Sequence, residues 1–274
     1  MSSKLKFFAL LAGGAASAFA MRKQLEKLEP KTPAVPHETV ILYQFDYSPY
    51  CAKVRHILDL KRIPYQCVEL LPMVHAGFTK RLSGQSKVPY IRHQGQIIAD
   101  SSSIALYLEE LQSEPSLFPG DAQDREQILL LEDWLDEAFQ GAVGKFTYLS
   151  LYLNPERAIK NPDLNTGVTL IDQHKDKIVP MMLGMNLRKN KLSPADLPRL
   201  KARVNEVFER LSGQLKGRDY LVGSQLSLAD ITLVSHLAST KMLPEISEDP
   251  DLAWLFEWRE GILAEIQSGQ IAKV

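Results

Sequence analysis

Cysteine is scarce in this chain of 274 residues, which contains only Cys51 and Cys67. Two cysteines are too few for the disulfide framework of a small secreted protein, and a reducing compartment fits the count better. The six histidines show neither H-x-H nor H-E-x-x-H spacing, so the sequence indicates no metal site.

An excess of charge of either sign is also lacking. The chain has 32 Lys and Arg residues against 33 Asp and Glu, a formal net charge of −1. This balance provides no general attraction to nucleic acid, so we expect no nucleic-acid partner. Apolar residues make up 45% of the chain and charged residues 24%, which is the composition of an ordinary globular protein with one or two domains.

A long hydrophobic run is missing as well. The apolar stretch at residues 7–21 falls short of the roughly 20 residues that a transmembrane helix needs. It has the size of a signal peptide, and the A-F-A triplet at 18–20 resembles a cleavage site. If the segment is instead a membrane anchor, the basic residues Arg22 and Lys23 that follow it would keep the main body of the protein in the cytoplasm. We expect a cytoplasmic body with membrane association through residues 7–21; organellar import and export stay open as alternatives.

The rest of the chain divides into a part with strands and a part without them. Prolines between positions 30 and 36 indicate an extended linker, so residues 1–38 are predicted to be a targeting or anchor segment plus this linker. The period-2 and helical patterns that follow predict strands at 39–45 and 63–70, a hairpin at 88–99, and helices at 50–61 and 100–111. A strand, a helix and a strand in this order imply parallel pairing with a right-handed crossover.

No convincing strand is predicted beyond a proline-containing linker at 112–123. Helical patterns cover residues 124–146, 197–215, 228–242 and 252–267, with a further helix near 168–187 in a stretch that is hard to assign. Ser227 and Asp230 have the spacing of a capping box, which predicts a helix start. We therefore expect an α/β domain at 39–112 and an all-helical domain at 122–274.

The strongest chemical signal is Ser48-Pro49-Tyr50-Cys51, where the first strand gives way to its helix. Unpaired N–H groups and the helix dipole make such a helix start favourable for an anion. Two cysteines in this spacing would form a redox pair, but serine occupies the first position. A serine hydroxyl here can instead donate a hydrogen bond to a thiolate supplied by a bound molecule, which lowers the pKa of that thiol.

Four segments together resemble the glutathione S-transferase superfamily. They are "SPYCAKVR" at the first strand–helix turn, "SKVPYI" with its Val-Pro pair, "IADSSSIALYL" at a helix start, and "YLVGSQLSLADITL" in the helical part. The resemblance covers roughly residues 39–267 and implies a thioredoxin-like N-terminal domain (β-α-β-α-β-β-α) followed by a helical-bundle C-terminal domain. The N-terminal domain is also similar to the membrane-associated type 2 prostaglandin E synthases, which have a Cys-x-x-Cys pair where this chain begins with serine.

The resemblance implies glutathione as co-substrate and assigns roles by matching positions. Ser48 would hydrogen-bond the glutathione sulfur as the catalytic residue. Val88 would bind the cysteinyl backbone, and Pro89, in a cis peptide bond, would keep that edge open. Asp100 and Ser101 would bind the γ-glutamyl end.

Other residues near these positions have competing interpretations. Lys87 could pair with the glycine carboxylate of glutathione, or it could be an ordinary surface charge. Ser48 could serve only as a helix cap. Cys51 could be a nucleophile that forms a mixed disulfide, although a buried structural role is favoured, and Cys67 is expected in the core. Three aromatic residues of the second half are assigned either to an apolar second-substrate site or to the core: Trp134, Phe139 and Tyr148.

The predicted function is that of a glutathione transferase acting on alkyl or aryl groups. It would activate the glutathione thiol for attack on an apolar electrophile, and the resemblance implies a homodimer. One alternative is a glutathione-dependent isomerase or synthase of the type 2 prostaglandin E synthase kind. Another is a membrane-tethered binding protein without catalysis.

Overall fold

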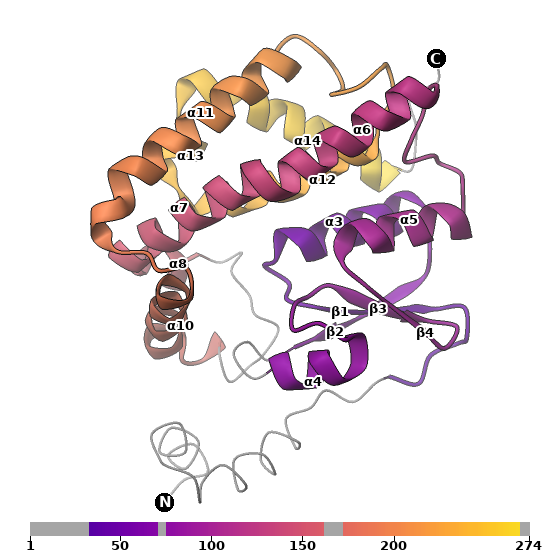
Figure 1. The fold of residues 1–274 in the computed structure, drawn as a ribbon, viewed down its shortest axis with the longest axis horizontal. Coiled ribbons are helices and arrows are strands. Elements are labelled where there is room, and N and C mark those ends of the chain that lie inside the picture. Colours follow the sequence, from indigo (N-terminus) through magenta and orange to yellow (C-terminus); the bar gives the residue numbers. More distant parts are fainter. Residues whose placement is uncertain (1–32, 71–74, 162–171, 269–274) are drawn as a thin grey trace, which may run out of the picture.

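The structure is a computed structural model that describes residues 33–70, 75–161 and 172–268. The predicted apolar segment at 7–21 and most of the proline-rich linker lie outside these ranges. The described part consists of a four-stranded sheet with three helices, followed by a larger assembly of helices (Figure 1).

The sheet has the strand order β2-β1-β3-β4. Its strands are β1 (Val40–Gln44), β2 (Tyr65–Glu69), β3 (Tyr90–His93) and β4 (Gln96–Ala99). β1 and β2 pair in parallel, as predicted, while β3 is antiparallel to both β1 and β4. The β3–β4 hairpin turns at the predicted place because Gln94 and Gly95 both have positive φ, 49° and 79°, which a two-residue turn requires.

Helices cover both faces of the sheet, and successive side chains of β1 point to opposite faces. Val40 and Leu42 join the core under α3 (Pro49–Leu60) and α5 (Ser101–Leu111). Ile41 and Tyr43 join a smaller cluster with Phe78 of α4 (His75–Ser83) on the opposite face. Figure 1 shows α3 and α5 between the sheet and the helical part, with α4 on the far side. The two glutathione-site helices predicted from the sequence, α3 and α5, therefore begin next to the helical part.

The second half of the described chain contains no strand. Its longer helices are α6 (Ala122–Trp134), α7 (Gln140–Leu153), α10 (Lys175–Lys189), α11 (Leu197–Leu215), α12 (Leu228–Leu237) and α14 (Ala253–Ser268). Its short elements are η1 (Leu135–Phe139), α8 (Glu156–Ile159), η2 (Pro194–Asp196), η3 (Ala238–Met242), α13 (Pro244–Ser247) and η4 (Pro250–Leu252). The predicted helix at 168–187 begins partly outside the described residues.

The predicted helix at 124–146 is longer and less regular than expected. It runs from α6 into α7 through one π-helical turn, η1, where Gln140 N–H bonds to the Leu135 carbonyl five residues back. Such a turn shifts the helical register by one position. The helical pattern over 124–146 places the apolar residue Leu130 with the other apolar residues of this helix, whereas in the structure Leu130 is 72% exposed.

One hydrophobic core extends across both halves. It includes Leu58 of α3, Ile104 of α5, Phe139 of η1 and Leu233 of α12, all fully buried. α12 packs along α3 and begins with the predicted capping box: the Asp230 carboxylate accepts from the Ser227 N–H (2.9 Å) and hydroxyl (2.7 Å). The helical part is thus fixed against the helix that starts at Ser48.

Candidate functional site

The predicted glutathione-site residues meet at one edge of the sheet. The pairing register places Tyr43, at the end of β1, opposite Tyr90, at the start of β3, and Tyr90 opposite Ala99, at the end of β4. Ser48 follows β1 by four residues, Pro89 immediately precedes β3, and Asp100 immediately follows β4. Three segments that are far apart in the sequence therefore converge where α3 and α5 begin.

Ser48 is the N-cap of α3. Its backbone is extended (φ −79°, ψ 125°), Pro49 is the first helical residue, and its Oγ accepts from the Cys51 N–H at 3.5 Å. A distance of 3.5 Å is the long limit of a hydrogen bond, so this cap is weak. The Ser48 hydroxyl is half-buried and also interacts with the Cys51 thiol, lowering the pKa of that thiol, so this hydroxyl is able to donate to a sulfur.

A polar network holds the turn between β1 and α3. Gln44 donates to the Glu69 carboxylate, and the Asp46 N–H donates to the same carboxylate at 3.1 Å. Arg55 reaches back from α3 and donates to the Asp46 carbonyl at 2.9 Å. The turn that carries Ser48 is thus fixed from both strands and from the helix, and the sequence interpretation missed this network.

Neither cysteine is activated. Cys51 is fully buried, and burial raises the pKa of its thiol to about 11 against the lowering effect of the Ser48 hydrogen bond. Cys67 was expected in the core but is only half-buried on β2; desolvation likewise raises the pKa of its thiol to about 11. A reactive thiolate needs a lowered pKa, so the geometry supports the structural role that was favoured for Cys51.

The Val88–Pro89 peptide bond is cis, as predicted. Val88 is half-buried and Pro89 is buried next to the stacked rings of Tyr43 and Tyr90, whose centroids are 4.5 Å apart. Lys87 is exposed. The structure thus leaves Lys87 at the surface, one residue before the cis bond.

Asp100, rather than a serine, caps α5. Its φ is +81°, and one carboxylate oxygen accepts from the N–H groups of Ser102 (3.0 Å) and Ser103 (3.1 Å). The Asp100 carboxylate accepts from two amides at once, which is the usual role of an aspartate at a helix N-cap. Asp100 itself is exposed, while Ser101 is 3% exposed at the first position of the helix.

A buried cluster of charges links this edge to the helical part. Lys53 of α3 is fully buried, and its ammonium group forms ion pairs with Glu132 of α6 and, at 3.0 Å, with Asp136 of η1. Ser102 of α5 donates to Glu132. We call Lys53, Ser102, Glu132, Asp136 and His236 the interdomain cluster, because its members come from both halves of the chain.

Asp136 is the centre of the interdomain cluster. His236 of α12 hydrogen-bonds to its second carboxylate oxygen at 2.7 Å, and the hydroxyl of Tyr50 donates to its backbone carbonyl at 3.0 Å. Burial alone would raise the pKa of Asp136, but the bond to His236 and the charge of Lys53 outweigh burial and lower it. Tyr50 lies two residues after Ser48, so the contact ties the start of α3 to η1.

The three aromatic residues considered for a second substrate separate into two groups. Phe139 is fully buried against Phe208, and Trp134 packs against the core with Arg210 over its ring. Tyr148 is 38% exposed. Burial raises the pKa of the Tyr47 hydroxyl, and the charge that Tyr148 could carry raises it further.

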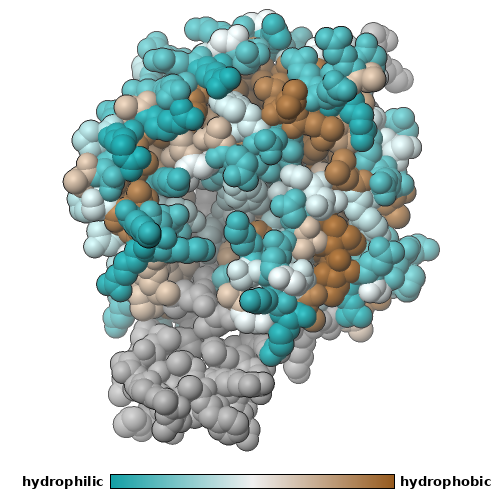
Figure 2. Space-filling view, in the orientation of Figure 1, coloured by the Kyte–Doolittle hydropathy of each residue, from teal (hydrophilic) through white to brown (hydrophobic). Residues whose placement is uncertain are grey.

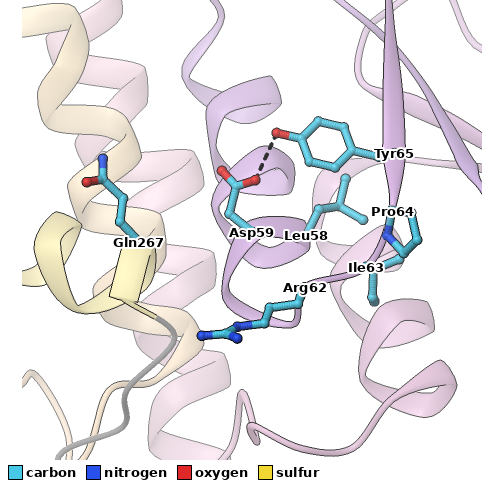
Figure 3. Close-up of a pocket in the computed structure, with 7 residues that line it drawn as sticks. All are labelled: Leu58, Asp59, Arg62, Ile63, Pro64, Tyr65 and Gln267. Atoms are coloured by element: carbon cyan, nitrogen blue, oxygen red, sulfur yellow. Dashed lines mark hydrogen bonds between the residues drawn. The ribbon is translucent and has the colours of Figure 1, made fainter.

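A well-defined cavity lies elsewhere. It has a volume of about 480 Å³ and is lined by Leu58, Asp59, Arg62, Ile63, Pro64, Tyr65 and Gln267. Figure 3 shows these side chains around the end of α3, the start of β2 and the end of α14. Asp59 accepts from Tyr65 at 3.0 Å and Arg62 donates to the Ser268 carbonyl at 2.9 Å, so these three polar side chains already have partners within the chain. This cavity is at the opposite end of α3 from Ser48.

The described ranges lack two features, a cluster of metal ligands and a membrane-spanning helix. Over residues 33–70, 75–161 and 172–268, three or more His, Cys, Asp or Glu side chains nowhere gather as a metal would require. In the same part of the chain, none of the helices has the length and apolar character needed to cross a membrane.

Both halves of the chain match known families. Residues 42–116 match the glutathione S-transferase N-terminal domain, and residues 176–264 match the glutathione S-transferase C-terminal domain. The chain therefore belongs to the glutathione S-transferase superfamily, with a thioredoxin-like N-terminal domain and a helical C-terminal domain.

Similar proteins of known sequence are distant. Protein LigF of Sphingobium sp. strain SYK-6 is 26% identical over 201 residues, which cover 70% of this chain and 76% of that protein. Glutathione S-transferase TCHQD of Arabidopsis thaliana is 24% identical, covering 74% and 77%. Prostaglandin E synthase 2 of Danio rerio is 35% identical over 65 residues, 24% of this chain and 17% of that protein. The resemblance to prostaglandin E synthases is thus limited to a short segment.

Solved structures share the fold at low identity. Ure2p in complex with glutathione has a TM-score of 0.61 at 15% identity, covering 84% of this chain and 96% of that one. A glutathione S-transferase from Methylobacterium radiotolerans, in complex with glutathione sulfonate, has a TM-score of 0.55 at 20% identity, covering 84% and 89%. These homologues bind glutathione or its sulfonate.

Proposed function

We propose that this protein is a glutathione transferase that binds glutathione at the sheet edge formed by Ser48, Val88–Pro89 and Asp100–Ser101. The observation that supports this most directly is the convergence of these three segments, through the register Tyr43–Tyr90–Ala99, at the starts of α3 and α5. Family membership and the glutathione complexes of homologous structures support the same ligand.

The tripeptide has a matching partner for each of its parts. The Val88 backbone would pair with the cysteinyl backbone as an added strand. The start of α5 at Ser101 would take the γ-glutamyl carboxylate, and Asp100 would lie near the ammonium group. Lys87, which is exposed, would pair with the glycine carboxylate. The cysteinyl sulfur would then lie at the Ser48 turn.

The proposed reaction is a substitution or addition by sulfur. The glutathione thiol loses its proton to solvent, and the thiolate accepts a hydrogen bond from the Ser48 hydroxyl at the partly positive start of α3. The sulfur then forms a bond to an electrophilic carbon, and a leaving group departs with its bonding electrons. Ionisation and positioning of the thiol supply the catalysis, because the protein provides no nucleophile of its own.

The test is the substitution Ser48→Ala. We expect turnover with an aryl halide to fall by about one to three powers of ten, the effect of deleting one preorganised donor, with a much smaller change in glutathione affinity. Cys51→Ser, which leaves this donor in place, is the matched control and should retain turnover. Activity that persists in Ser48→Ala but disappears in Cys51→Ser would assign the chemistry to the Cys51 thiol instead.

One alternative rests on the short match to prostaglandin E synthase 2. A bound thiol could open a peroxide instead of attacking carbon, and the product would be an isomer of the substrate. Turnover of an endoperoxide in the absence of turnover of an aryl halide would favour this alternative. Intact folding without any binding of glutathione would favour a non-catalytic protein.

A further inference from the structure

The first turn of α3 is weakly capped. The Ser48 hydroxyl accepts from the Cys51 N–H only at 3.5 Å, and Pro49, the first helical residue, has no N–H group. A helix start with so weak a cap depends on contacts outside the helix to keep its position. The position matters because the Ser48 hydroxyl is proposed to donate to the glutathione sulfur. Tyr50, two residues further on, supplies such a contact.

The Tyr50 hydroxyl bonds to a backbone carbonyl of the π-helical turn η1. In an α-helix, the Gln140 N–H would bond to the Asp136 carbonyl four residues back. In η1 this N–H bonds to the Leu135 carbonyl instead, and the Asp136 carbonyl accepts from the Tyr50 hydroxyl at 3.0 Å. The change of register in η1 thus makes the Asp136 carbonyl available to a side chain of α3.

Asp136 is bound by α3 at two points and by α12 at a third. Lys53 follows Tyr50 by three residues, on the same face of α3, and pairs with the Asp136 carboxylate at 3.0 Å. His236 bonds to the other carboxylate oxygen at 2.7 Å, and its ring lies edge-on to the Tyr50 ring with the centroids 5.2 Å apart. Tyr50, Asp136 and His236 therefore contact one another, and the Tyr50 hydroxyl meets an acceptor that is held in place.

The Tyr50 hydroxyl is a donor to the protein and not to the glutathione sulfur. Burial, and then the charge of Asp136, raise the pKa of this hydroxyl, so it keeps its proton at neutral pH. A hydroxyl has a single proton to donate, and the Asp136 carbonyl accepts it. An effect of Tyr50 on a bound thiol therefore has to act through the position of Ser48.

We propose that Tyr50 is a positioning residue for the Ser48 hydroxyl: through its bond to the Asp136 carbonyl it holds the first turn of α3 against η1. This inference rests on the proposed glutathione transferase function and adds a residue to it. With the turn held, the Ser48 hydroxyl stays within reach of the bound sulfur, and the partly positive start of α3 stays directed at the thiolate. The helical part of the chain thus contributes to ionisation of the thiol through one hydrogen bond.

The test is Tyr50→Phe, which removes the hydroxyl and keeps the ring beside His236. The ionisation constant of the thiol of glutathione bound to the full chain, followed by thiolate absorbance, should fall about threefold. Turnover with an aryl halide should fall about three- to tenfold. Glutathione affinity, measured at a pH below the thiol pKa, should stay within about twofold, because the substitution changes no group assigned to bind the tripeptide.

The matched control is Tyr220→Phe. Tyr220 is half-buried, as Tyr50 is, and its hydroxyl donates to Glu265 at 3.1 Å within the helical part. The control removes the same atom and a comparable hydrogen bond, so it should lower the urea midpoint to a similar extent. The bound-thiol pKa of Tyr220→Phe should equal that of the wild-type protein.

A double variant separates positioning from stability. Because Tyr50 acts through Ser48, adding Tyr50→Phe to Ser48→Ala should raise the bound-thiol pKa no further. Additive effects of the two substitutions would overturn the inference. A Tyr50→Phe protein that loses stability as Tyr220→Phe does, while its bound-thiol pKa matches that of the wild type, would also overturn it; both results leave the transferase proposal standing. A wild-type chain that binds no glutathione would refute the transferase proposal and this inference with it.

Discussion

Ser48 has an oxygen atom at the position where the first cysteine of a Cys-x-x-Cys redox pair would have its sulfur. The one cysteine nearby, Cys51, is fully buried, with the pKa of its thiol raised to about 11. A hydroxyl at this position cannot be oxidised to a disulfide but can donate to a thiolate. The chemistry of the site therefore depends on a sulfur that the chain does not contain.

The two thiols should react slowly with an alkylating reagent. Burial raises the pKa of both Cys51 and Cys67 to about 11, so their thiolate fractions at neutral pH are small. We expect iodoacetamide to modify the native chain at least about tenfold more slowly than it modifies an unfolded control, with Cys51 the slower of the two. Mass spectrometry of the time course measures this. Rapid labelling of Cys51, or its ready glutathionylation, would instead identify it as a nucleophile.

Stability should fall in mild acid because of buried histidine. Burial, and then the charges of Arg55 and Arg259, lower the pKa of His56 to about 4. A histidine with a lowered folded pKa stays neutral in the native state while the unfolded chain takes up a proton below about 6.5. The contribution of His56 to the free energy of unfolding is thus fully present above that pH and is lost as the pH falls toward 4. His236, whose pKa is also lowered by burial, acts in the same direction.

The measurement is denaturant unfolding at pH 7.5 and pH 5. One histidine of this kind accounts for a loss of about 2 kcal/mol between pH 7.5 and pH 5. His56→Gln, which removes the titration and can still bond to Ser235, should show a correspondingly smaller loss. An identical pH dependence in both proteins would show that His56 is not buried in its neutral form.

At the scale of elements, the starts of α3 and α5 are fixed by the helical part as much as by the sheet. Lys53 of α3 and Ser102 of α5 both bond to Glu132 of α6, and Lys53 also pairs with Asp136. The π-helical turn η1 contains Asp136, and such turns often occur at functional sites. The interdomain cluster thus sets the spacing between two helix ends that would bind opposite ends of glutathione.

Removing the cation of this cluster should be strongly destabilising. In Lys53→Met, Glu132 and Asp136 keep their buried carboxylates but lose their partner, which costs about 3–5 kcal/mol. Urea unfolding measures the loss, and Lys145→Met, an exposed lysine, is the control. Adding Glu132→Gln to Lys53→Met should restore part of the stability, because one unpaired charge is removed. A change below about 1 kcal/mol in Lys53→Met, the range of a surface pair, would contradict the buried geometry.

The sequence predicted the elements well and the cluster not at all. Strands and helices follow from local patterns, such as the alternation in β1 and the capping box at Ser227. The structure confirms both of these predicted features. The burial of Lys53 depends on partners some 80 positions away in the chain, Glu132 and Asp136, which no local pattern indicates. The same holds for Leu130, whose exposed side chain follows from how α6 lies in the whole molecule.

At the scale of the whole molecule, the two halves share one core, and the boundary predicted between residues 112 and 122 stays a prediction. Three exposed apolar side chains belong to elements that Figure 1 draws on the right of the view, a side called the flank below: Ile97 of β4 (39% exposed), Leu106 of α5 (39%) and Leu130 of α6 (72%). Figure 2 shows apolar surface on the right of the view, where Figure 1 places β4, α5 and α6. This flank is consistent with the homodimer expected from the sequence.

We predict that the protein is a dimer at micromolar concentration through this flank. Leu130→Glu places a charge in the apolar surface and should shift the mass from dimer to monomer without loss of helical content. Light scattering after size-exclusion chromatography measures the mass, with Leu153→Glu, an exposed leucine of α7, as the control (40% exposed). A wild-type protein that is monomeric, or a dimer unchanged in Leu130→Glu, would contradict the prediction.

The most direct test of the central claim is a pH titration of glutathione bound to the full chain, followed by the ultraviolet absorbance of the thiolate. The account predicts that wild-type protein lowers the pKa of the bound thiol below that of free glutathione, and that Ser48→Ala raises it again by about one unit or more. The same bound-thiol pKa in both proteins would contradict the role assigned to Ser48.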